Sequence, residues 1–189
     1  MKAARLLDAG RRMLNISRRV QPVRPRRRAG IWQRGNMSPE GDRLIRESWE
    51  SLLPVSDALV AKFYARLFES NPQLEQLFHP TDMREQRRKF TVMLSEIVRV
   101  IDRPEILISE VADSGRRHVS YGVQDRDYED VGAALLWAIG DALGDRATPE
   151  VLSAWREAYD LLAAVMRRAA MRISGASFPA VVTPPATAQ

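Results

Sequence analysis

Hydrophobic residues recur at helical spacing along most of this chain. In the stretch that begins at residue 83, Met83, Phe90, Met93, Ile97 and Val100 are apolar, with charged residues between them. Residues at this spacing share one face of an α-helix. We find no convincing alternation with a period of two, which would indicate strands. The pattern predicts an all-α fold with six substantial helices and a short turn near residues 72–78.

Helix boundaries are marked by residues that favour starts and stops. Ser38 precedes Pro39, and Thr148 precedes Pro149, two pairs that are typical of an N-cap followed by the first helical position. Gly122 follows a helical pattern at a place where a left-handed C-cap is expected. These signals divide residues 37–172 into helices that are joined by short connections.

Length and composition limit the protein classes that remain. A chain of 189 residues is enough for one domain of ordinary size. We expect an extension over residues 1–36, a domain over 37–172 and a flexible tail over 173–189. The chain has no cysteine, which excludes disulfides, cysteine-bound metal sites and thiol nucleophiles, and which fits a reducing cytoplasm. No apolar run approaches the length of a transmembrane helix.

Positive charge is concentrated in residues 1–36, which hold eleven Lys or Arg and one acid, Asp8. Three interpretations stay open. The first is that translation starts at Met37, just before a natural helix start. The second is that the segment is a disordered basic tail. The third is that the segment contacts an anionic membrane surface or phosphates by charge. We find no base-reading element, so we expect no specific nucleic-acid partner.

Three polar side chains fall on or beside inward-facing stripes of three different helices: Tyr64, Gln86 and His118. A buried polar group costs free energy unless it finds a partner. Each residue has an ordinary explanation alone, because a core histidine is often simply hydrogen-bonded, a tyrosine at a stripe edge often reaches solvent and a glutamine often caps a loop. Together they indicate a core that encloses a ligand.

Four segments carry a resemblance to a known family: "FYARLFESNPQLEQLF", "REQRRKFTVML", "GRRHVSYGVQDRDYEDVGAALLWAIGDALGD" and "LSAWREAY". They resemble the globin domain of bacterial flavohaemoglobins and of single-domain bacterial haemoglobins, over roughly residues 38–172. The resemblance implies a globin fold, a three-over-three helical sandwich around a haem pocket, and haem b (iron protoporphyrin IX) as cofactor.

The resemblance also implies a role for each candidate site residue. His118 is expected to be the proximal ligand of the haem iron, and Tyr64 and Gln86 the distal pair that stabilises a bound gas. For Arg117 two interpretations are open, contact with a haem propionate and simple solvation. Further contacts with the haem or its ligand are implied for Phe78, Phe90, Val123 and Tyr128.

The chain departs from the flavohaemoglobin pattern in two places. No flavin or nicotinamide region follows the globin pattern, so turnover that leaves ferric iron would need a separate reductase. The family has a proximal glutamate that falls at Ala170 here. Its loss leaves the imidazole less electron-rich and puts peroxidase-like chemistry in doubt. His79 follows Phe78 directly, and we expect it at the surface.

These observations lead to three candidate functions. The first is a haem protein that binds dioxygen reversibly, for storage, delivery or transport. The second is a nitric oxide dioxygenase that uses a separate reductase, since the distal pair would serve both functions. The third is a sensory globin module, with or without haem.

Overall fold

The computed structural model describes residues 38–78 and 81–173, apart from a few side chains in the helix that bears His118 and that of Ile173. The described part is helical and contains no strand. Its elements are α3 (Pro39–Leu52), η2 (Leu53–Val55), α4 (Ser56–Ser70), α5 (Pro72–Leu77), α6 (Met83–Arg99), α7 (Pro104–Tyr121), α8 (Asp127–Leu143), η3 (Gly144–Arg146) and α9 (Pro149–Ile173). The expected all-α class, with six substantial helices and a short one at 72–77, is confirmed.

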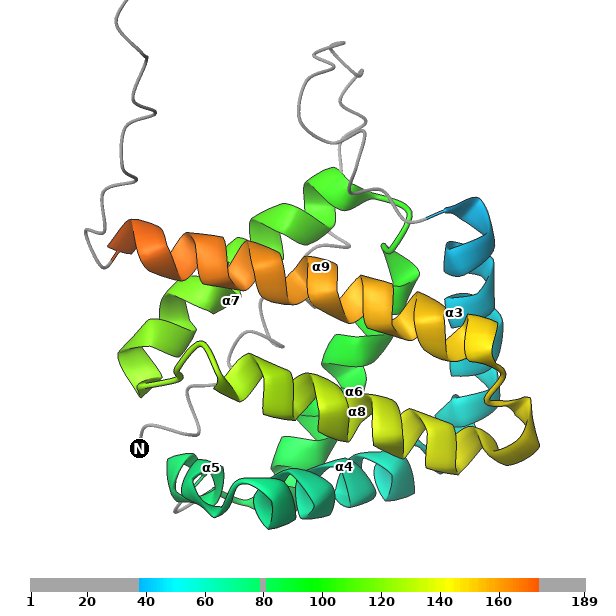
Figure 1. Cartoon of the computed structure of the whole chain (residues 1–189), viewed down its shortest axis with the longest axis horizontal. Helices are drawn as coiled ribbons and strands as arrows, with labels where there is room; N and C mark the ends of the chain where they lie inside the picture. The colour runs from blue at the N-terminus through cyan, green and yellow to red at the C-terminus, as the bar shows by residue number, and fades with distance from the viewer. Residues whose placement is uncertain (1–37, 79–80, 174–189) are drawn as a thin grey trace, which may run out of the picture.

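The helices pack as crossing pairs (Figure 1). Helices α8 and α9 run alongside one another across the view, and α4 lies below α8. Helix α7 packs against α9, and α3 contacts α6, α8 and α9. No helix in the described ranges is long and apolar enough to cross a membrane.

Local signals set the helix ends where the sequence indicates them. The Ser38 hydroxyl accepts a hydrogen bond from the Gly41 amide at 3.0 Å, and Pro39 occupies the first position of α3. Asp82 caps α6 by accepting from the amides of Arg84 and Glu85. Such caps satisfy amides that a helix cannot pair itself. The cap therefore fixes where α6, the helix that carries Gln86, begins.

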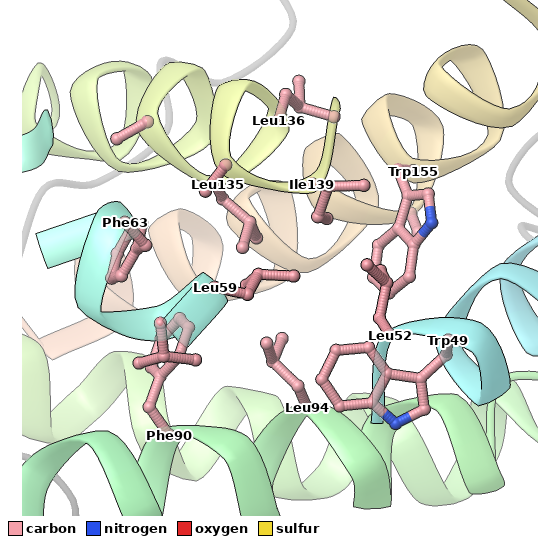
Figure 2. Packing of buried hydrophobic residues seen from close by; sticks show 14 of the residues in the cluster. Trp49, Leu52, Leu59, Phe63, Phe90, Leu94, Leu135, Leu136, Ile139 and Trp155 are labelled. Atoms are coloured by element: carbon pink, nitrogen blue, oxygen red, sulfur yellow. The ribbon is translucent and has the colours of Figure 1, made fainter. Parts of the chain in front are cut away.

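A buried core joins α3, α4, α6, α8 and α9 (Figure 2). Trp49 and Trp155 meet edge to face at 6.1 Å, and each indole has a hydrogen-bond acceptor. Trp155 donates to the Ser48 hydroxyl at 3.0 Å, and Trp49 donates to Ser95 at 3.3 Å. A smaller apolar cluster joins α6, α7 and α9. Side chains from both clusters line the cavity described below.

Two glycines allow close helix crossings near that cavity. A Cβ at Gly115 would lie 2.5 Å from the backbone oxygen of Met166, so α7 and α9 touch through their backbones. A Cβ at Gly132 would lie 2.5 Å from the Tyr159 ring. No real Cβ sits that close, so a larger residue at either position would push helices apart. Gly115 thus fixes the depth of α7 one turn before His118.

Candidate functional site

A cavity lies between the helices and is walled mainly by apolar side chains. Including its opening to solvent, it encloses about 1160 Å³. Helices α4, α5, α6, α7, α8 and α9 all contribute to its wall. The polar and titratable groups that line it are Tyr64, Gln86, Ser114, His118, Asp127, Tyr128 and Tyr159.

Tyr64 and Gln86 form a hydrogen-bonded pair in the cavity wall. The Gln86 amide nitrogen donates to the Tyr64 hydroxyl oxygen at 3.0 Å, and both residues are at most 5% exposed. Burial raises the pKa of Tyr64 well above its ordinary value, and the hydrogen bond from Gln86 lowers it by less. The phenol therefore keeps its proton at any physiological pH. Because its oxygen accepts from Gln86, its O–H proton remains available for a further acceptor.

Aromatic rings surround this pair and hold it in place. The Tyr64 ring contacts Phe78 edge to face at 5.4 Å and Phe90 at 5.8 Å. Phe63 stacks on Phe90 at 4.7 Å with nearly parallel planes. These contacts join α4, α6 and the end of α5. They bury Tyr64, which the sequence pattern placed at the edge of its stripe, and they leave the phenol few alternative positions.

His118 enters the cavity from the last turn of α7. Its Nδ1 lies 2.7 Å from the Ser114 carbonyl oxygen, a distance at which Nδ1–H donates to that oxygen. This hydrogen bond selects the tautomer that carries a lone pair on Nε2, the form in which an imidazole binds a metal. Ser114 lies one turn before His118, so the α7 backbone itself orients the ring.

The end of α7 brings His118 and Val123 to the same cavity. Gly122 has a φ of +86°, and the Val123 amide donates to the His118 carbonyl at 3.2 Å. This is the geometry of a left-handed C-cap, which glycine adopts without strain. The chain turns back after the cap, so Val123 lies in the wall beside the imidazole's own helix.

Tyr128 and Tyr159 support the His118 part of the wall. The Tyr128 ring lies 6.2 Å from the His118 ring, with 25° between their planes. The Tyr159 hydroxyl donates to the Tyr128 backbone carbonyl and so ties α9 to the start of α8. Burial raises the pKa of both phenols, which stay neutral near pH 7.

Most of the residues predicted from sequence meet in this one cavity. Those that line it are Tyr64, Phe78, Gln86, Phe90, His118, Val123 and Tyr128. The side chains of Arg117 and His79 lie outside the described residues, as do the basic segment 1–36 and residues 174–189, so the predictions about them stay predictions. Ala170 lies half-buried on α9.

The sequence analysis did not select Ser114, Asp127 or Tyr159 as wall residues. The spacing of four between Ser114 and His118 was a signal, because such residues share a helix face. Asp127 is 6% exposed and accepts from the Gln124 amide at 2.7 Å. It begins α8, and a polar residue at a helix start gives no sign from sequence that it will be buried.

The cavity fits a haem by the chemistry of its wall. A porphyrin needs a large apolar slot, and an iron atom inside it needs a nitrogen donor such as a neutral imidazole. The cavity provides the slot, and the tautomer of His118 provides the donor. The Tyr64 hydroxyl adds a proton donor for a polar ligand within the same wall.

A family model described as Globin matches residues 61–166, which is more than half of the chain. The chain belongs to the globin family. The expected resemblance is confirmed, and the protein is a haem-binding, globin-type protein.

Relatives of known sequence support this assignment. This globin is 32% identical over 147 residues to a flavohemoprotein of Rhodopirellula baltica, covering 76% of this chain and 36% of that protein. It is 34% identical over 129 residues to a flavohemoprotein of Bordetella pertussis, covering 67% of this chain and 32% of that one. The globin therefore spans about a third of the length of these relatives.

Solved structures confirm the globin fold. An engineered carbene transferase, described as a putative nitric oxide dioxygenase from Rhodothermus marinus, superposes with a TM-score of 0.64 and 32% identity. It covers 73% of this chain and 96% of its own. A bacterial globin from Campylobacter jejuni superposes with a TM-score of 0.64 at 24% identity, covering 72% of this globin and 99% of its own chain.

Proposed function

We propose that this globin binds dioxygen reversibly at a haem b whose iron is held by His118. The observation that supports the proposal is a single apolar cavity with two polar features in its wall. One is a histidine whose tautomer leaves a lone pair on Nε2, and the other is a hydrogen-bonded tyrosine–glutamine pair. When bound, the haem supplies an iron atom that takes diatomic gases and exchanges electrons.

The protein's part in this function is to select and hold the gas. The Tyr64 O–H donates to a polar ligand in the cavity, and Gln86 orients the phenol by donating to its oxygen. A hydrogen bond to a partly charged acceptor contributes about 1.5–3 kcal/mol. Because about 1.4 kcal/mol is a factor of ten, Tyr64 alone slows ligand release by roughly tenfold to a hundredfold. Slow release suits scarce oxygen or consumption of the bound gas.

His118 and its supports hold the cofactor. The Ser114 carbonyl fixes the imidazole, and Tyr128 and Val123 pack on the same part of the wall. Phe78 and Phe90 exclude water from the vicinity of Tyr64. Propionate binding by Arg117 remains part of the proposal, as does action in the cytoplasm, which the lack of cysteine favours.

A second candidate function is nitric oxide dioxygenation with electrons from a separate reductase. The names of the flavohemoprotein relatives and of the Rhodothermus marinus protein favour it. Nitric oxide and dioxygen need one electron to form nitrate, so continuous turnover needs a donor. The pair Tyr64 and Gln86 serves this reaction as it serves binding.

One experiment tests both functions. The haem-loaded full chain is reduced, freed of reductant under air, and mixed with nitric oxide while absorbance and nitrate are followed. A stable oxygenated spectrum supports reversible binding, whereas rapid autoxidation contradicts it. One nitrate per haem without a reductase, and many with a flavin reductase, would favour the dioxygenase.

Tyr64→Phe measures the part played by the phenol. Oxygen dissociation in stopped flow should become at least tenfold faster, because the ring stays and only the donor is lost. Phe68→Leu is the matched control, since Phe68 contacts the Tyr64 ring but has no polar atom. An unchanged rate in Tyr64→Phe would show that the phenol does not face the ligand.

A further inference from the structure

Arg167 of α9 lies over the ring of Tyr128, the tyrosine that stacks on His118. Its guanidinium carbon is 5.4 Å from the centre of the Tyr128 ring, within the range of a cation–π contact. The same ring has the imidazole as a second neighbour, at 6.2 Å. A cation, a phenol and the imidazole thus follow one another from α9 through α8 to α7.

Acidic residues and a carbonyl hold the guanidinium in this place. Its Nε forms an ion pair with Asp125 at 2.7 Å, although the angle is poor for a hydrogen bond. Its Nη2 donates to the Asp125 backbone oxygen at 3.0 Å and lies 3.7 Å from a Glu129 carboxylate oxygen. The guanidinium is therefore held by two groups of Asp125, in the turn before α8, and by Glu129 in the first turn of α8.

The charges of this cluster do not act equally on the cavity. The Arg167 side chain is 29% exposed, whereas those of Asp125 and Glu129 are 78% and 79% exposed. Water screens an exposed charge far more than one that is packed against a ring. Of the charges in this cluster, the positive one is in contact with Tyr128 and so acts most directly on the ring beside the imidazole. The buried Asp127 side chain also lines the cavity, and it is present in the parent and in every Arg167 variant alike.

We propose that Arg167 is a positioning residue that raises the reduction potential of the haem by holding a permanent positive charge behind Tyr128 and His118. The inference rests on the proposed role of His118 as iron ligand. A nearby positive charge disfavours ferric iron, which carries one more positive charge than ferrous iron. Arg167 therefore favours the ferrous state that reversible oxygen binding requires.

The expected size follows from distance. The contacts with Tyr128 place the guanidinium carbon within about 12 Å of the His118 ring, where an effective dielectric constant of about 20 applies. Allowing for screening by the carboxylates, loss of the charge should lower the ferrous-to-ferric ratio at a fixed potential by roughly threefold to tenfold.

The test is a potentiometric titration of the haem-loaded full chain, with the Soret band and melting temperature recorded for every variant. The midpoint reduction potential of Arg167→Gln should be lower than that of the parent protein. That of Arg167→Lys should stay close to the parent value, because lysine keeps the positive charge. Arg168→Gln is the matched control, since it removes the same charge from the exposed neighbouring position. In Arg168→Gln the ferrous-to-ferric ratio at a fixed potential should change by less than about twofold.

Outcomes that overturn the inference are specific. Equal midpoints in Arg167→Gln and Arg168→Gln would remove any special role for Arg167, and a low midpoint in Arg167→Lys would assign the effect to shape rather than charge. If Arg167→Gln loses its haem, its midpoint potential cannot be measured, and the Glu129→Gln variant becomes the test of the inference. It should raise the midpoint slightly by removing an opposing charge, and an unchanged or lower midpoint contradicts the inference.

The proposed role of His118 and the proposed role of Arg167 can be refuted independently of one another. If His118→Ala keeps the parent's haem spectrum, the ligand assignment is wrong whatever the Arg167 variants show. If His118→Ala loses the haem band and Arg167→Gln shifts nothing, the ligand assignment stands and the charge inference falls.

Discussion

The two polar regions of the cavity are built in different ways. Around Tyr64 and Gln86 the surroundings are aromatic, and the hydrogen bond that links the pair runs between two neutral side chains. Around His118 the imidazole is held by the Ser114 backbone carbonyl and stacks on the Tyr128 ring. Ionisable groups occur in this region, with Asp127 in the cavity wall and Arg167 over Tyr128.

This difference separates two tasks. A neutral pair inside aromatic rings keeps its protons at all physiological pH values, so it can discriminate between gases without changing with pH. A backbone-held imidazole keeps one orientation and one tautomer, which suits a metal ligand. In the proposal above, the charge of Arg167 raises the reduction potential of the haem from outside the cavity. The following variants test that division, in order of decreasing expected effect.

The largest effect is expected for His118→Ala. The variant should lose haem on gel filtration, seen as loss of the Soret band, because the iron loses its protein ligand. Added imidazole should restore part of the band by filling the space left by the ring. Tyr64→Phe, which changes the other region, should keep its haem. Equal haem loss in both variants would show that the two regions are not divided in this way.

Gly115→Ala tests whether the backbone sets the His118 region. The added Cβ meets the Met166 backbone at 2.5 Å, so α7 and α9 must separate. Overpacking of this kind costs about 1–3 kcal/mol of unfolding free energy, measured by urea denaturation. Gly140→Ala is the matched control, because its Cβ would meet only a Leu152 methyl at 3.7 Å. It should be neutral or slightly stabilising. Equal stability in both variants would refute the close crossing.

Gln86→Leu asks whether the glutamine acts directly or through tyrosine. Because its amide donates to the Tyr64 oxygen, its loss should speed oxygen dissociation by about fivefold, the worth of one ordinary hydrogen bond. The effect should be smaller than that of Tyr64→Phe. A larger effect in stopped flow would mean that Gln86 itself donates to the ligand.

The smallest effect concerns alkaline stability. Burial raises the pKa of Tyr64 and of Tyr159 above their ordinary value of about 10, which both regain on unfolding. The unfolded chain therefore loses protons first, and the free energy of unfolding should fall as pH rises above about 10. Denaturation curves from pH 8 to 11 measure this slope. Tyr64→Phe and Tyr159→Phe should each flatten it, and a slope unchanged in both would contradict the burial of the phenols.

Much of this site was predictable because the helices are regular. Periodicity places Gln86 and His118 on inward faces, and a proline and a glycine mark where α7 begins and ends. The burial of Tyr64 was not predictable from its own helix. It depends on Phe78 and Phe90, which close over the ring from other elements.

Charge near the site could not be read from sequence either. The sequence shows Ala170 where the resembling family has a glutamate, and so predicts a proximal region that lacks a carboxylate. It does not show that Arg167, one turn earlier, lies over Tyr128. That contact depends on how α8 and α9 cross, and the close approach of Gly132 to Tyr159 belongs to the same crossing.

Hydrophobic periodicity and capping are local properties of the chain, so the helical class and the helix boundaries could be predicted from the sequence. The residues that we propose to serve a haem follow from the resemblance to globins and not from these local patterns. The tertiary structure was needed to show which of those residues share a cavity and where Arg167 holds its charge. These depend on contacts between helices far apart along the chain, and the energies of such contacts are set by packing geometry that no local pattern contains.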